Sequence, residues 1–213
     1  ILEIYQIGHG AFCTFGGIVY YRSGSLNSKL GGKTLQDYMV KKHILSFDES
    51  ISKAKLEDID IKKLKDFLKT RSPTASFEDN AIEEHLLNLG LAQKDEEFFI
   101  NNTAILFFAQ NPFKFLPQNE LKLVRFSGME PIDIIDSRFM SSTILEELKE
   151  AEEFIRKNIR TAFKIEKLER TEVPEYPSSV IREALVNALV HRDYFSKDAI
   201  QINIFDDRME FIN

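Results

Sequence analysis

The segment REALVNALVHRDY, residues 182–194, places three polar side chains at steps of four, Glu183, Asn187 and His191, among small and aliphatic residues. On an α-helix these side chains fall within an arc of about 80° and form one polar stripe. A carboxylate and an amide one turn apart supply the oxygen ligands that Mg²⁺ prefers and a base for an attacking water. The stripe is therefore compatible with a magnesium–nucleotide site.

Structural interpretations of the same stripe stay open. Asn187 fits a buried amide that binds a neighbouring loop, and His191 fits the end of the helix. Glu183 fits an ion pair with Arg182 or Arg192. Spacing alone does not choose between these roles and a nucleotide site.

The composition describes a folded, acidic chain with a basic N-terminal part. Of the 213 residues 43% are hydrophobic and 11% aromatic, and the formal net charge is −6. This charge argues against general coating of nucleic acid, which requires many Lys and Arg to neutralise phosphates. Residues 1–46 nevertheless hold more basic than acidic residues, and here Arg22 with Tyr21 could contact a nucleic-acid backbone through charge and stacking. A surface arginine on a strand edge is the alternative.

The single cysteine and the hydropathy pattern indicate the cellular compartment of the protein. Cys13 has no second cysteine for an internal disulfide, and neither a secretory signal nor an apolar run of about 18 residues is present. We therefore expect a cytoplasmic protein without a membrane partner. The chain begins with Ile1 and ends in MEFIN, inside an expected strand, so we expect it to be part of a longer polypeptide.

The first elements are expected in residues 11–71. The aromatic and β-branched residues of 11–25 favour strand, turn, strand, and Thr34 fits the cap of a helix over 35–42. Asp60 is a good N-cap for a second helix that ends near Arg71. Pro73 follows in a linker, because proline cannot continue a helix.

The remaining elements follow from periodicity and caps. We expect a helix over 77–90 that ends at Gly90, a short hairpin over 91–101, and a helix over 103–110 capped by Asn102. This order is compatible with a winged helix. The other expected elements are a strand over 121–128, a helix over 142–159 whose charged residues form a solvated face, a strand over 161–173, a helix over 176–194, and a hairpin over 199–213.

The C-terminal motif resembles a known family. The string YPSSVIREALVNALVHRDY, followed by AIQINIFDDRMEFIN, resembles the ATP-binding part of bacterial and archaeal proteins known as RecG-related helicases or Schlafen/AlbA_2-type transcriptional regulators. In that family the C-terminal domain is similar to the GHKL nucleotide fold. Upstream, LNLGLAQKDEEFFINNTAILFFAQNPFKFLP resembles the segment that joins the two domains, and YYRSGSLNSKL resembles the end of the N-terminal AlbA-like domain.

The resemblance implies roles for individual residues. In the helix called the N box, here about 177–193, Glu183 matches the general base or water-orienting carboxylate, and Asn187 matches the Mg²⁺ ligand. ATP and Mg²⁺ are the implied cofactors. Residues of the HRDY string are implied to contact phosphate or shape the pocket: His191, Arg192 and Asp193.

We therefore expect an α+β chain of two modules. Residues 1–71 are expected to be the C-terminal part of an AlbA-like domain, and residues 72–213 a winged-helix-like linker leading into a truncated GHKL-like α/β sandwich. The implied function is that of a DNA-associated transcriptional regulator with a Mg²⁺–nucleotide region.

Other functions stay open beside this one. The adenine-binding Asp-x-Gly-x-Gly box and the glycine-rich lid of GHKL proteins do not occur in these residues, so we do not expect this segment to hydrolyse ATP. An ATPase or an AlbA-type nuclease is open for the full-length protein. A non-enzymatic binding or oligomerisation module is the alternative, with a homodimer contact through the helix over 142–159.

Overall fold

The computed structural model describes residues 13–15, 18–23, 26–41, 46–73, 81–166 and 169–213. Helices and strands are mixed along the chain, so the predicted α+β class is confirmed. The chain forms two compact units, residues 1–50 and 51–213. No helix in the described part combines the length and the apolar character needed to cross a membrane.

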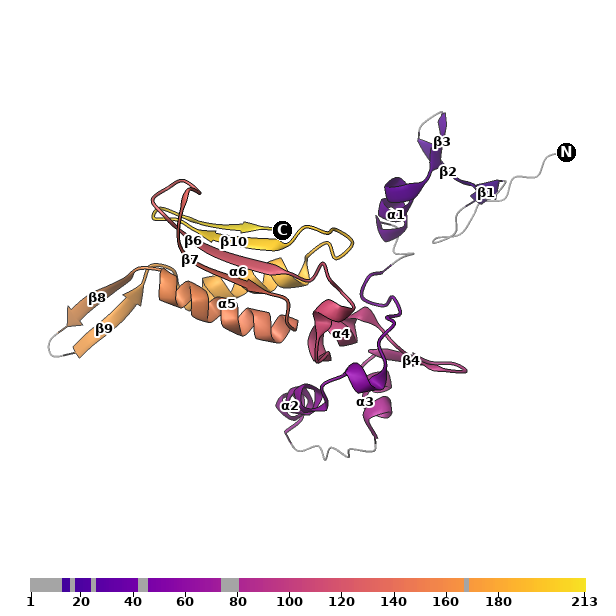
Figure 1. Cartoon of the computed structure of the whole chain (residues 1–213), viewed down its shortest axis with the longest axis horizontal. Helices are drawn as coiled ribbons and strands as arrows, with labels where there is room; N and C mark the ends of the chain where they lie inside the picture. The colour runs from indigo at the N-terminus through magenta and orange to yellow at the C-terminus, as the bar shows by residue number, and fades with distance from the viewer. Residues whose placement is uncertain (1–12, 16–17, 24–25, 42–45, 74–80, 167–168) are drawn as a thin grey trace. The chain divides into compact units, whose positions relative to one another are not determined.

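The first unit contains a small antiparallel sheet and one helix (Figure 1). Strands β1 (Cys13–Phe15), β2 (Ile18–Ser23) and β3 (Leu26–Leu30) pair in that order, and helix α1 (Gly32–Lys41) follows. The sequence predicts the first two strands but not β3. Helix α1 begins at Gly32, two residues before Thr34, the expected cap. Thr34 lies in the first turn, and its Oγ1 donates to the Gly31 carbonyl at 2.7 Å.

The boundary between the units falls earlier than the predicted break at residues 71/72. Helix α2 (Ile61–Arg71) belongs to the second unit, because Ile59 forms a β-bridge with Ala109 and the Phe67 ring meets the Phe108 ring edge-on at 5.4 Å. The predicted N-cap of this helix is confirmed: Asp60 Oδ1 accepts from the amides of Lys62 and Lys63 at 2.9 and 3.2 Å. A short 3₁₀ turn, η1 (Leu56–Asp58), precedes it.

The predicted helix–hairpin–helix order follows. Helix α3 (Ile82–Asn88) has Leu89 as its C-cap, and Gly90 follows with a φ of 69°, so the predicted glycine lies just beyond the end of the helix. The predicted start of this helix at residues 77–80 lies outside the described residues. Strands β4 (Ala92–Lys94) and β5 (Phe98–Ile100) form the expected hairpin. Helix α4 (Asn102–Phe108) is capped by Asn101 rather than by Asn102, because Asn101 Oδ1 accepts from the Ala104 amide at 3.0 Å.

A four-stranded mixed sheet in the order β11-β10-β6-β7 forms the C-terminal half. Strands β6 (Leu121–Ser127) and β10 (Ile200–Ile204) run parallel in its centre, while β7 (Asp133–Met140) and β11 (Met209–Ile212) are antiparallel neighbours on the outside. Helices α5 (Ile144–Asn158) and α6 (Ser178–Val190) lie side by side on one face of the sheet (Figure 1). Between the helices and the sheet lies a core that includes Leu121, Leu123, Ile155, Leu185, Ile200 and Ile202.

Residues 161–174 form two strands rather than the single predicted strand. Strand β8 (Thr161–Glu166) pairs antiparallel with β9 (Glu169–Pro174), and the hairpin extends away from the sheet (Figure 1). The sequence does not predict this turn, because the residues between the two strands, Lys167 and Leu168, are not of the types that favour turns, such as glycine, proline and asparagine. Another 3₁₀ turn, η3 (Pro112–Lys114), lies between α4 and β6.

Candidate functional site

Helix α6 presents the predicted polar stripe on its outer face. Ile181, Leu185 and Leu189 are buried on the opposite face, whereas Glu183 and Asn187 are not buried. The Asn187 side-chain amide donates to Glu183 Oε1 at 3.1 Å. The structure therefore brings the predicted carboxylate and amide together. Asn187 is not the buried amide of the alternative interpretation, and Arg182 pairs with Glu152 rather than with Glu183.

The Glu183–Asn187 pair fits a magnesium ion. Because Asn187 uses its nitrogen for the hydrogen bond to Glu183, its carbonyl oxygen remains available as a ligand. Mg²⁺ in nucleotide sites commonly takes one or two protein oxygens and completes its shell with water and phosphate. Such an ion would neutralise charge on bound phosphates. The described residues contain no group of three or more His, Cys, Asp or Glu side chains suited to a metal.

The HRDY string divides into buried and exposed members. His191 ends α6, where its amide donates to the Asn187 carbonyl at 3.0 Å, and its side chain is exposed. Asp193 is also exposed and accepts from the Phe195 amide at 3.0 Å. Tyr194 is buried, and its hydroxyl donates to the Leu189 carbonyl at 2.9 Å. The two exposed side chains, His191 and Asp193, remain accessible to a ligand at the C-terminal end of α6.

Arg192 holds three chain segments together. It is 7% exposed, and its guanidinium donates to the carbonyls of Glu120 at 3.4 Å, Asp198 at 2.7 Å and Gln118. Gln118 in turn donates from its side chain to the Tyr194 carbonyl at 3.1 Å. These bonds clamp the end of α6 to the loop before β6. The bonds assign Arg192 a structural role in the free protein, and contact with a nucleotide would require them to break.

Glu147 is a buried carboxyl group that the sequence does not distinguish from the other acidic residues of α5. The acidic residues of α5 are predicted to be a solvated face, yet Glu147 is 1% exposed and accepts from the Ser142 amide at 3.2 Å. Burial raises its pKa to about 8, against the opposing effects of the Ser142 bond and of Arg192. The prediction of a solvated face is therefore wrong for this residue.

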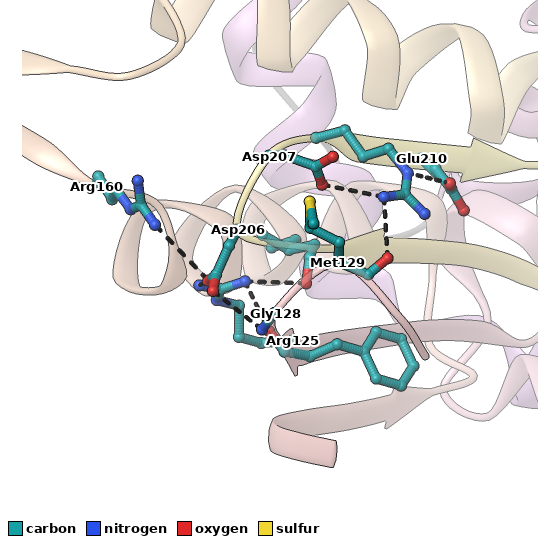
Figure 2. A network of polar contacts seen from close by, with 10 residues as sticks. Arg125, Gly128, Met129, Arg160, Asp206, Asp207 and Glu210 are labelled. Carbon is teal, nitrogen blue, oxygen red and sulfur yellow. Dashed lines mark hydrogen bonds and ion pairs between the residues drawn. The ribbon is translucent and has the colours of Figure 1, made fainter. Parts of the chain in front are cut away.

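A second polar cluster lies at the end of the sheet, where two turns meet (Figure 2). Asp206, after β10, pairs with Arg125 and accepts from the Gly128 amide at 3.0 Å. Arg160 also approaches Asp206, with 3.9 Å between Nη2 and Oδ1. The Arg125 hydrogen bond lowers the pKa of Asp206. Because Arg125 also donates to two backbone carbonyls, those of Phe126 and Ile204, this cluster fastens the turns to each other.

The predicted nucleic-acid residues lie on β2 of the first unit. Tyr21 is opposite Ser28 and Arg22 is opposite Asn27 in the β2–β3 pair. Their side chains lie outside the described part of the structure. The contact with nucleic acid therefore stays a prediction.

Comparison with known proteins identifies a fold relative. No protein-family profile matches the chain, and no curated protein matches it. The crystal structure of the DIP2311 protein from Corynebacterium diphtheriae is similar to it, with a TM-score of 0.57 and 22% sequence identity. The alignment covers 89% of this chain and 37% of that chain. At this identity the likeness shows the shared fold alone, and this chain spans well under half of the length of that protein.

Proposed function

We propose that this chain is part of a cytoplasmic, DNA-associated transcriptional regulator of the RecG-related, Schlafen/AlbA_2 type, with a GHKL-like region that binds a Mg²⁺–nucleotide at α6. The observation that supports the nucleotide site is the solvent-accessible Glu183–Asn187 pair, 3.1 Å apart on a helix whose opposite face packs into the core. Asn187 would hold the metal, and Glu183 would orient or deprotonate the water. His191 and Asp193 would contact phosphate.

Calorimetric titration of Mg²⁺–ATP into the full-length protein tests this site. Asn187→Ala is expected to weaken the affinity at least about tenfold, because the substitution removes the metal's protein ligand. Asn88→Ala is the matched control, since Asn88 is an asparagine at the end of α3, another helix. Equal affinity in the Asn187 variant and the native protein would refute the ligand assignment.

Charge on the second unit supports one orientation for DNA. Helix α2 carries five basic residues in the sequence IKKLKDFLKTR, and Lys62, Lys69 and Arg71 are exposed. By contrast, the first turn of α3 contains Glu83 and Glu84, and the turn of the β4–β5 hairpin is acidic. Phosphates are attracted to the first surface and repelled by the second. The α2 surface is therefore the side of this unit that would face DNA.

The salt dependence of DNA binding tests the α2 surface. Replacing Lys62 and Lys69 by glutamine is expected to reduce the slope of log K against log salt by about 0.9 for each phosphate that the protein no longer neutralises. The measurement is fluorescence anisotropy of a labelled duplex with the full-length protein across a salt series. Lys53→Gln and Lys94→Gln together provide a control of equal charge outside α2. An unchanged slope in the α2 variant would place DNA binding elsewhere.

A non-enzymatic binding or oligomerisation module is the second candidate, and the β7 edge supports it. Ile134, Ile135 and Phe139 on this outer strand are 61 to 67% exposed, and exposed apolar residues on an edge strand favour association. The α5 surface, which the sequence suggests for a homodimer contact, is less suitable, because most of its apolar residues pack inside the unit. If neither the native protein nor the variant binds Mg²⁺–ATP, this second candidate is favoured.

A further inference from the structure

A cavity of about 430 Å³ lies between α5, the start of α6 and the base of the β8–β9 hairpin. Its walls come from Glu152 and Arg156 on α5, Pro174 at the end of β9, and Tyr176 and Arg182 around the first turns of α6. Glu183 and Asn187 do not line it. The cavity is therefore separate from the proposed nucleotide site.

The charged groups of the cavity leave one cation in excess. Arg182 Nη1 lies 2.7 Å from Glu152 Oε1, so these two side chains neutralise each other. Arg156 is exposed at the rim, and among the residues that the structure describes no carboxylate lies within ion-pair distance of it. A guanidinium in this state is suited to bind a carboxylate or phosphate through two parallel hydrogen bonds.

The rest of the lining is largely apolar. Ile181 is 8% exposed and forms a buried part of the wall, Ile159 and Tyr176 are half-buried, and Pro174 contributes a further apolar surface. The volume lies within the range of about 300–1,000 Å³ that is typical of small-molecule sites. A single inorganic anion would leave most of this space to water, so the cavity is suited to a ligand with an apolar body.

We propose that this cavity binds a small organic anion with an aromatic or other planar apolar group and one phosphate, sulfonate or carboxylate. Arg156 pairs with the anionic group, and the hydroxyls of Ser178 and Ser179, which also line the cavity, are additional donors. The apolar body lies against Tyr176 and Ile181. This site does not depend on nucleotide binding at Glu183 and Asn187.

Phenyl phosphate is the probe for this site. Inorganic phosphate, which has only the anionic group, and phenol, which has only the aromatic ring, are the control ligands. In a titration followed by amide chemical shifts, phenyl phosphate is expected to saturate shifts at Tyr176, Ser178 and Ile181. Each half alone is expected to bind at least about tenfold more weakly, because it uses only the charged or only the apolar part of the lining. Failure to saturate, or shifts confined to Glu183 and Asn187, would overturn the proposal.

Three variants complete the test. Arg156→Gln is expected to weaken phenyl phosphate binding about tenfold, whereas Lys149→Gln, which removes a cation two turns earlier on α5, is expected to have no effect. Glu152→Gln is expected to strengthen binding severalfold, because it frees Arg182 for the anion. Unchanged affinity in both Arg156→Gln and Glu152→Gln would overturn the proposal even if one variant were poorly folded.

Discussion

Replacing Arg192 by methionine is expected to lower the free energy of unfolding by about 3 kcal/mol, because three backbone carbonyl groups lose the charged donor that they share. The carbonyls of Gln118, Glu120 and Asp198 converge on this guanidinium from two loops that are distant in sequence. Methionine keeps much of the side-chain volume, so the decrease in the free energy of unfolding reflects lost hydrogen bonds more than lost packing. Urea denaturation at neutral pH measures this free energy.

Arg182→Met is the control for this prediction. Its side chain is 60% exposed and pairs with Glu152, and exposed ion pairs contribute about 0–1 kcal/mol. If the Arg192 variant were as stable as the native protein but bound Mg²⁺–ATP more weakly, the clamp would be incidental. Arg192 would then act on phosphate, as the family resemblance implies.

Replacing Glu147 by glutamine is expected to stabilise the protein at alkaline pH and to flatten its pH dependence. The pKa of Glu147 is about 8 in the folded chain and ordinary in the unfolded chain. The folded state therefore retains a proton that the unfolded state loses, and this contribution to stability falls as pH rises from the unfolded pKa through 8. At alkaline pH the glutamine variant should be more stable than the native protein by on the order of 3 kcal/mol.

The test is a series of unfolding measurements across the range from acidic to alkaline pH. Glu153→Gln is the control, because Glu153 is on the same helix and is not buried, and its pH profile should follow that of the native protein. The raised pKa would be contradicted if the free energy of unfolding of the native protein did not fall, relative to that of the Glu147 variant, as the pH rises.

The elements with local signals could be predicted from the sequence. Helix α5 has a capping box, in which Thr143 and Glu146 bond to each other's backbone or side chain, and an apolar repeat that is buried as expected. The β10–β11 hairpin follows the expected turn at Asp206 and Asp207. The adjacency of Glu183 and Asn187 could also be predicted, since it depends only on helical spacing.

Other features depend on contacts between distant segments and had no local signal. The β7 strand lies on the outside of the sheet with most of its side chains exposed, so it lacks the alternation that marks a half-buried strand. The Arg192 clamp depends on the loop before β6, and the HRDY motif alone does not distinguish its buried members from its exposed ones. Pro73 indicated a domain boundary, but α2 remains attached to α4 through Phe67 and Phe108.

The parallel pairing of β6 with β10 has a consequence for biosynthesis. The ribosome synthesises β6 first, then α5, the β8–β9 hairpin and α6, and only then β10. One edge of the central strand therefore has no native neighbour while residues 128–199 are added. Unpaired strands of this kind fold slowly and promote aggregation. The sheet is thus expected to form after synthesis of its last hairpin, and a nascent chain halted before β10 would be a substrate for chaperones.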